Sequence, residues 1–431
     1  MKAHHLPQDL QVLGRNLFFS YYVAEFSRTW EFLYAYQDAP TTPEHLTLLV
    51  DAVSLAFLSH QVSSQTARDL GMRKYGTALK KFTRTMQDPN NFCKPSTLES
   101  VLLFDLFEKI MEPDAGLDYS NTHVQGALAL VKLRGIGQFN EPKEVKALMG
   151  LALSATINSL CSGDPIPEAV RDIRKHAAQF VDTSYPKWKL SGVILDVTDT
   201  PAEMLFYESR CSSNSTKSIE LDKKLEEIAL EAGPAWTYER NFISGHDPRR
   251  MVPDDFFPVY DVYPNRTITQ MYNVLRLSRI LLCEQIIDDL PSMDDECAGP
   301  LIERAKLTIT AMIREILASV PQMTNCNLAA KHKLPKDSLP DHHTHTMSHI
   351  LDVYVLIYPL YIVAWSQNCP PTAREWTMSQ LRHISEHFGI KEASSVIDIL
   401  RKRDNQGEII DAWYVLPLFL KIFWFSRQPA S

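Results

Sequence analysis

The chain has 431 residues, a hydrophobic share of 45% and a formal net charge of −8. This length and this apolar share can build one large hydrophobic core or two smaller ones. An acidic chain repels the phosphate backbone of nucleic acids, so the charge disfavours DNA or RNA binding by the whole surface. With only 15 glycines, the sequence also disfavours glycine-rich nucleotide-binding loops and tightly turned β folds.

Three runs in the first 110 residues have apolar side chains three or four positions apart. Such spacing places the side chains on one face of an α-helix and predicts that this face is buried. The pair Thr42-Pro43 and the segment from Ser96 to Glu99 are typical of helix starts, so we expect helices to begin there. The apolar members of the runs are Leu46, Leu49, Val50, Val53 and Phe57; Tyr75, Leu79, Phe82 and Met86; and Val101, Leu102, Leu106 and Ile110.

The middle of the chain is less regular. A helix is expected from His123 to Gly135, with Gly135 as its C-cap. Residues 193–197 form the best candidate for a strand, and a helix turn fits them as well. We expect loops at residues 211–218, which are polar, and at residues 245–264, which contain four prolines and cannot form a continuous helix.

The C-terminal part again predicts long helices, with one irregular stretch at residues 321–341. Residues 372–375 resemble a capping box ahead of a helix that Gly389 is placed to end. The apolar stripes of these helices are Ile302, Ala305, Ile309, Met312, Ile316 and Val320, and then Leu381, Ile384 and Phe388.

Two segments, residues 350–365 and 409–425, are the most apolar of the chain. Each contains an aspartate and a proline and falls short of the roughly 18–20 apolar residues that a bilayer span requires. We therefore expect buried helices there and no membrane contact. Together these patterns predict an all-α fold of packed antiparallel helices, with one helical half in residues 1–240 and another in residues 241–431.

The seven cysteines are scattered, and no two of them have CxxC spacing. This arrangement predicts a reducing compartment and no disulfide framework. The N-terminus, Met-Lys-Ala-His-His-Leu-Pro, lacks the apolar core of a secretion signal, so we expect no such leader.

An acidic segment runs from Asp288 and Asp289 to Asp294, Asp295 and Glu296. In an all-α protein it suggests the magnesium-diphosphate site of a terpene synthase, which needs several carboxylates on one helix face. Pro291 separates the two acidic pairs, and no companion metal motif follows. We favour an acidic loop between helices and keep a terpene-synthase-like enzyme as the alternative.

Histidines gather near residue 345. His345 and His349 are four positions apart, so on a helix they would share a face and could bind zinc. No glutamate lies between them and no third ligand is evident, so we favour a polar helix start. His123 is expected to form a hydrogen bond between helices. The sequence thus assigns no catalytic, cofactor-binding or metal-binding residue and predicts no enzymatic activity.

Five blocks of residues follow one another between residues 75 and 390. In this order they resemble the helical regulatory region of fungal binuclear-zinc-cluster transcription factors. The blocks contain Tyr75, Ala78, Leu79, Leu98, Phe107 and Glu108; His123, Gly126, Ala127, Leu130, Arg134 and Gly135; Val262, Tyr263, Pro264, Tyr272, Asn273, Arg276, Arg279 and Ile280; Ile316, Ser319, Val320 and Pro321; and Tyr358, Pro359, Leu360, Arg374, Glu375, Trp376, Leu381, His387, Phe388, Gly389 and Ile390.

The resemblance implies a multi-helix regulatory domain, residence in the nucleus and control of a metabolic or specialised-metabolite gene cluster. Two departures from the family pattern stand out. Tyr272 and Tyr358 replace tryptophans that are common in the family, and the N-terminal cluster of six zinc-binding cysteines is absent from this sequence. Any contact with DNA is therefore expected to be indirect, through a partner.

Three partners or ligands fit such a regulator: a second copy of the chain, a transcription factor that carries its own zinc cluster, and a small-molecule effector held between helices. A zinc cluster encoded by an upstream exon is a further explanation for the missing cysteines. A helical adaptor without any role in transcription is the remaining alternative.

Overall fold

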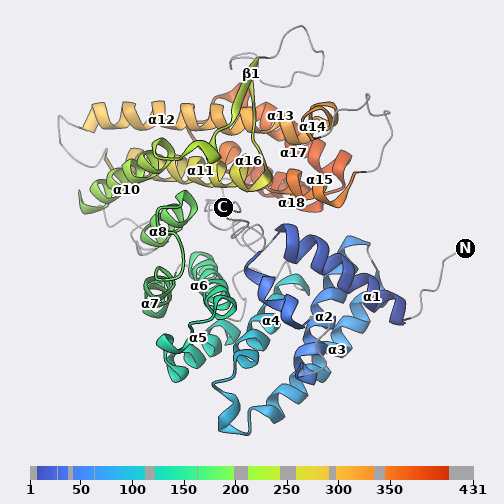
Figure 1. Ribbon diagram of the computed structural model, residues 1–431. Helices are drawn as coiled ribbons and strands as arrows, with labels where there is room; N and C mark the ends of the chain where they lie inside the picture. Colours follow the sequence, from blue (N-terminus) through green and yellow to red (C-terminus); the bar gives the residue numbers. More distant parts are fainter. Residues whose placement is uncertain are drawn as a thin grey trace, which may run out of the picture. The chain divides into compact units, whose positions relative to one another are not determined.

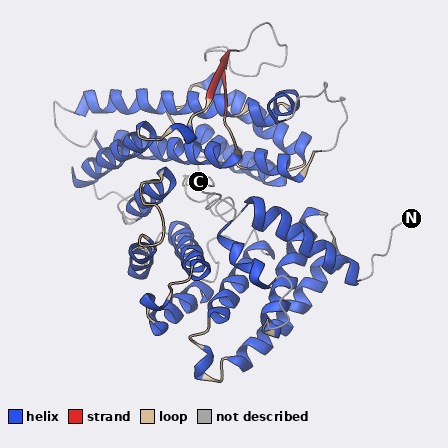
Figure 2. Cartoon of the chain, viewed as in Figure 1, coloured by secondary structure: helices blue, strands red, loops and turns tan. Residues whose placement is uncertain are grey.

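The protein is all-α, as the sequence predicts (Figures 1 and 2). The computed structural model describes residues 7–26, 28–36, 42–62, 64–111, 122–162, 164–198, 212–242, 259–290, 298–333 and 345–406. Within these residues, β-structure is confined to one two-stranded hairpin. The apolar segment 409–425 and the acidic residues 294–296 lie outside the described ranges.

The chain forms two compact units. The first consists mainly of Met1–Ser162 and Ile166–Asp182, and the second mainly of Thr183–Phe419. The boundary expected near residue 240 falls inside the second unit, on strand β1.

The first unit contains short and long helices in the following order: α1 (Pro7–Leu17), η1 (Phe18–Phe26), η2 (Arg28–Tyr36), α2 (Glu44–Gln61), α3 (Gln65–Thr85), η3 (Pro89–Asn91), α4 (Pro95–Met111), α5 (Thr122–Arg134), η5 (Ile136–Gln138), α6 (Pro142–Ser162) and α7 (Glu168–Ala177). Helix α2 lies at the centre and packs against α1, α3 and α4. Gly71 lets α3 approach closely, because a Cβ there would lie 3.3 Å from the Ala52 carbonyl oxygen.

The second unit contains α8 (Pro186–Thr198), α10 (Ser212–Leu230), η6 (Pro234–Trp236), β1 (Glu239–Phe242), β2 (Val259–Val262), α11 (Arg266–Asp289), α12 (Ala298–Ser319), α13 (Pro321–Thr324), α14 (Cys326–Lys333), α15 (Met347–Tyr354), α16 (Ile357–Trp365), α17 (Pro371–Phe388) and α18 (Lys391–Gln406). Helices α10, α11 and α12 lie side by side (Figure 1). Most residues of α11 are buried, so this helix forms the centre of the unit.

Most of the predicted apolar stripes are buried as expected. The stripe from Leu46 to Phe57 is buried on α2, and the stripe from Ala305 to Ile316 is buried on α12. The stripe from Tyr75 to Met86 is the exception, because Leu79 is 39% exposed and Tyr75, Phe82 and Met86 are only partly buried. Gly135 and Gly389 follow the ends of α5 and α17 with φ of 84° and 70°, which confirms both predicted C-caps.

Helix starts were harder to predict. Helix α2 begins at Glu44, after Pro43, so the expected start at Thr42-Pro43 is one residue too early. Helices α4 and α17 both begin at a proline, ahead of the capping boxes expected at Ser96 and Thr372. Proline is favoured at a first helical position because its fixed φ suits the helix and its missing N–H has no partner there.

Two expected loops are corrected by the structure. Residues 212–218 form the first turns of α10, because serine and asparagine are well tolerated where backbone N–H groups are still unpaired. Residues 321–324 and 326–333 are helical as well.

The proline-rich stretch 245–264 contains strand β2, which pairs with β1 in antiparallel register from Glu239–Val262 to Phe242–Val259. The strand candidate at 193–197 is part of helix α8.

The apolar segment around α15 and α16 is buried. Of the described residues, only Met347–Trp365 is long and apolar enough to cross a membrane by length and composition. Yet 78% of its apolar window is buried inside the protein. There α16 packs against α11, α17 and α18, as the core helix of a folded unit does.

Candidate functional site

Arg276 is the centre of a polar network inside the second unit. Its guanidinium donates hydrogen bonds to the Tyr263 hydroxyl at 2.8 Å and to the Asn273 side-chain carbonyl at 3.1 Å, and its Nε donates to Glu315 at 2.9 Å. Asn273 in turn donates to the Ser319 hydroxyl at 2.9 Å. We call Tyr263, Asn273, Arg276 and Ser319 the Arg276 network.

The Arg276 network is buried and surrounded by aromatic rings. Arg276 is only 1% exposed, and Asn273 and Ser319 are fully buried. The guanidinium carbon lies 5.3–5.8 Å from the ring centroids of Tyr238, Tyr263 and Tyr272, close enough for cation–π attraction. Since a buried charge is tolerated only when it is paired, this cage explains how the helix centre accommodates an arginine.

Gln322 anchors the short helix α13 to this network. Its side chain accepts a hydrogen bond from the Tyr263 backbone N–H at 2.8 Å and donates one to the Tyr263 carbonyl at 2.9 Å. The paired bonds fix the backbone of α13 relative to the end of strand β2.

A second constellation lies in the first unit, where α3, α4 and α5 meet. Tyr75 donates a short hydrogen bond to the Glu108 carboxylate, and the same carboxylate oxygen lies 2.9 Å from Nε2 of His123. The Tyr75 ring stacks on Phe107 with centroids 4.4 Å apart. We call Tyr75, Glu108 and His123 the Glu108 triad. It confirms the expected role of His123 as a hydrogen-bonded histidine between helices.

The Glu108 triad is less buried than the Arg276 network, since the side chains of His123 and Glu108 are 21% and 32% exposed. Partial burial alone would raise the pKa of Glu108. Hydrogen bonds from His123 and Tyr75 outweigh it and leave the pKa of Glu108 below its ordinary value.

The arginines near the C-terminal end of the described chain cap helix α16. Arg374 donates to the Ala364 carbonyl and Arg403 donates to the Trp365 carbonyl, both in the last turn of that helix. Cations at a helix C-terminus satisfy carbonyls that have no partner in the helix. Arg403 is thus engaged inside the unit, while its neighbours Arg401 and Lys402 are exposed.

Lys80, Lys81 and Arg84 form a basic run on α3 that is partly paired. Lys81 forms an ion pair with Glu44 at 2.7 Å, and Lys80 is exposed. Arg84 lines a hollow at the surface together with Lys94, next to the start of α4. Most of the charge in this run faces solvent.

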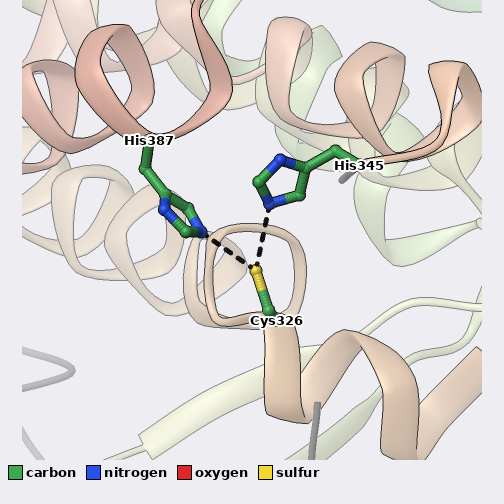
Figure 3. A group of neighbouring side chains, drawn as sticks. All are labelled: Cys326, His345 and His387. Carbon is green, nitrogen blue, oxygen red and sulfur yellow. Dashed lines mark hydrogen bonds between the residues drawn. The ribbon is translucent and has the colours of Figure 1, made fainter. Parts of the chain in front are cut away.

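Three side chains from distant parts of the second unit converge on one point (Figure 3). The Cys326 sulfur lies 3.4 Å from Nε2 of His345 and 3.3 Å from Nε2 of His387. The three potential ligand atoms all lie within 4.8 Å of one another. Cys326 opens helix α14, His345 lies two residues before α15, and His387 is in the last turn of α17.

The pairing within this Cys-His cluster differs from the sequence prediction. Nε2 of His349 lies 2.8 Å from the Met323 carbonyl oxygen, so this nitrogen is not directed at the cluster. Instead, the potential ligand atoms next to His345 come from Cys326 and His387. No local spacing signals this set, because His387 lies 61 residues after Cys326. Only the packing of α13, α14 and α17 brings them together.

The first acidic pair lies at the end of α11. Burial raises the pKa of both Asp288 and Asp289, and Glu284 raises that of Asp288 further. The helix ends at Asp289, two residues before Pro291. Neither aspartate belongs to a group that could hold a metal ion within the described residues. The other carboxylates of the terpene-synthase alternative, Asp294, Asp295 and Glu296, lie outside them.

Comparison with known proteins adds no relative: no protein-family model, curated protein or solved structure matches this chain. The resemblance to fungal transcription factors therefore stays a prediction from the residues.

Proposed function

We propose that the chain is a helical regulatory protein of the fungal transcription-factor type, which acts in the nucleus through contacts with a protein partner. A second copy of the chain or a transcription factor with its own zinc cluster would bring it to DNA. Control of a metabolic gene cluster is the corresponding role. A small molecule bound between helices would supply the signal.

One observation carries this proposal: within each unit, polar residues of successive blocks contact one another. The third and fourth blocks meet in the Arg276 network, where Asn273 of α11 donates to Ser319 at the end of α12. The first and second blocks meet in the Glu108 triad, where Glu108 of α4 contacts His123 of α5. Residues of these four blocks therefore hold helices together within each unit, as expected for a pattern that specifies a helical fold.

The placement of charge supports an indirect contact with DNA. Lysine and arginine side chains that neutralise phosphates supply much of a protein's affinity for DNA, and the chain as a whole is acidic. Arg276 and Arg403 donate hydrogen bonds to groups inside the second unit. Recruitment by a partner would avoid the repulsion between the acidic chain and the phosphates of DNA.

Tethering the full chain to an unrelated DNA-binding domain tests the proposal. Expression of a reporter downstream of the matching site should change relative to the DNA-binding domain alone. Arg276→Ala should abolish the change because it disrupts the second unit, whereas Lys306→Ala, an exposed position on α12, should leave it intact. A reporter that responds to none of these fusions would favour the helical adaptor.

Chromatin immunoprecipitation of the tagged chain gives an independent test. Enrichment at particular promoters that disappears when a co-purifying zinc-cluster protein is deleted would support indirect recruitment. Binding of the purified chain alone to a defined DNA duplex would contradict it.

A further inference from the structure

We propose that Cys326, His345 and His387 bind a zinc ion and leave one coordination position open to solvent. This site does not depend on the proposed regulatory function. It uses none of the residues of the Arg276 network or the Glu108 triad, and its test is metal binding by the isolated chain.

The two distances from the Cys326 sulfur fit a tetrahedral zinc ion. Bonds of about 2.3 Å to sulfur and about 2.0–2.1 Å to nitrogen place a sulfur and a nitrogen ligand about 3.5 Å apart. The observed distances from the Cys326 sulfur are 3.4 Å and 3.3 Å. Both imidazole rings turn a nitrogen toward the sulfur (Figure 3).

The ligand types favour zinc over the common hard cations. A thiolate and two imidazoles are soft or intermediate ligands, whereas magnesium and calcium prefer oxygen. A cysteine that only needed activation as a nucleophile would require one base, and here two imidazoles converge on one sulfur. Convergence of three ligand atoms is the arrangement that a metal ion uses.

The surroundings hold the ligands in place. Helix α13, just before Cys326, accepts hydrogen bonds at two carbonyls: Met323 from His349 at 2.8 Å and Thr324 from His383 at 3.4 Å. Phe388 packs against the rings of His345 and His387, with centroids 4.2 Å and 4.9 Å away. Supporting contacts of this kind fix ligand orientation and raise metal affinity.

A helix cap orders the segment that carries Cys326. The side chain of Asn325 accepts hydrogen bonds from the backbone N–H groups of Asn327 and Leu328 and so caps helix α14. Cys326 is the first residue of that helix, so the cap fixes the backbone that carries its sulfur.

The burial of the three ligands indicates how many coordination positions of the ion the protein fills. Cys326 and His345 are half-buried, and His387 is exposed. An ion held by these three side chains keeps a face toward solvent, where water completes the tetrahedron. The ion would join α14, the segment before α15 and the end of α17, whose ligands lie 19 and 61 residues after Cys326.

Metal analysis of the full chain tests this proposal. After dialysis against a weak chelator, the chain should retain one zinc ion, and added zinc should raise its melting temperature. Cys326→Ser and His387→Gln should each weaken zinc binding by more than about 10-fold, the loss that even supporting residues produce. Cys369→Ser and Glu386→Gln are the matched controls and should bind zinc like the unaltered chain.

Cobalt provides a second readout that needs no variant. Co²⁺ bound to the unaltered chain should give the near-ultraviolet sulfur-to-cobalt band and the strong visible bands of a tetrahedral site. Cys326→Ser should lose the near-ultraviolet band while its far-ultraviolet circular dichroism stays the same. Absence of the band in the unaltered chain, absence of zinc binding, or equal zinc affinity in the unaltered chain and His387→Gln would each overturn the site.

Discussion

The Glu108 triad and the Arg276 network are built in the same way but differ in burial. Each joins helices through polar side chains from two blocks of the sequence. The Glu108 triad is partly open to water and consists of groups that gain or lose protons. The Arg276 network excludes water and centres on a guanidinium that stays charged at every accessible pH. The contrast suggests that the second unit depends on its polar centre far more than the first.

The largest expected effect comes from Arg276→Ala. Removing the guanidinium takes a charged donor from the buried Tyr263 hydroxyl and Asn273 carbonyl, and each hydrogen bond to a charged group contributes about 1.5–3 kcal/mol. Denaturant unfolding of the full chain should show this loss in the transition of the second unit. Lys306→Ala, which removes an exposed ion pair with Glu303, should cost less than about 1 kcal/mol. Similar losses in both variants would erase the contrast between buried and exposed charge.

The next effect concerns Glu99, a carboxyl buried in α4 of the first unit. Burial raises its pKa to about 7, although the neighbouring Tyr36 hydroxyl and Lys143 act in the opposite direction. The unfolded chain gives up this proton near its ordinary pKa of about 4.5, while the folded chain holds it up to about pH 7. Stability should therefore fall as the pH rises between these values.

Glu99→Gln removes this cost. The variant should be more stable than the unaltered chain by roughly 2–3 kcal/mol at pH 8 and nearly equal to it at pH 4. Unfolding free energies measured across this range would show the difference. A variant that is destabilised at pH 8 would mean that the charged carboxylate contributes to the fold.

The smallest effect is expected in the Glu108 triad. Because the pKa of Glu108 is lowered in the folded chain, its contribution to stability is present above about pH 4.5 and is lost as the pH falls further. Glu108→Gln should reduce the unfolding free energy at pH 7 by less than about 1 kcal/mol, since the group is partly exposed. The variant should also be less sensitive to acid. A loss as large as that of Arg276→Ala would mean that the Glu108 triad and the Arg276 network contribute equally to stability.

Helices could be predicted from the sequence because a helix that buries one face has apolar residues at every third or fourth position. The stripe from Ala305 to Ile316 is an example, and Gly389 marks a helix end because only a residue without a side chain adopts its backbone angle easily. The hairpin was missed, since strands of four residues leave too little alternation to detect. Helix starts shifted wherever a proline occupied the first position.

The Cys-His cluster could be predicted only in part. The sequence drew attention to His345, but spacing along a helix suggested His349 as its companion. In the structure, the hydrogen bond from His349 to the Met323 carbonyl directs that histidine elsewhere. Cys326 and His387 reach His345 through tertiary packing, and nothing in a linear pattern encodes a contact across 61 residues.

Helix α13 has a consequence for how the second unit is held together. Its Gln322 holds the backbone of Tyr263, and the next two residues accept hydrogen bonds from His349 and His383. The four residues of α13 thus contact Tyr263, next to strand β2, on one side and His349 and His383 on the other. His349 and His383 therefore contact the same short stretch of backbone whose Gln322 side chain holds Tyr263 beside the Arg276 guanidinium.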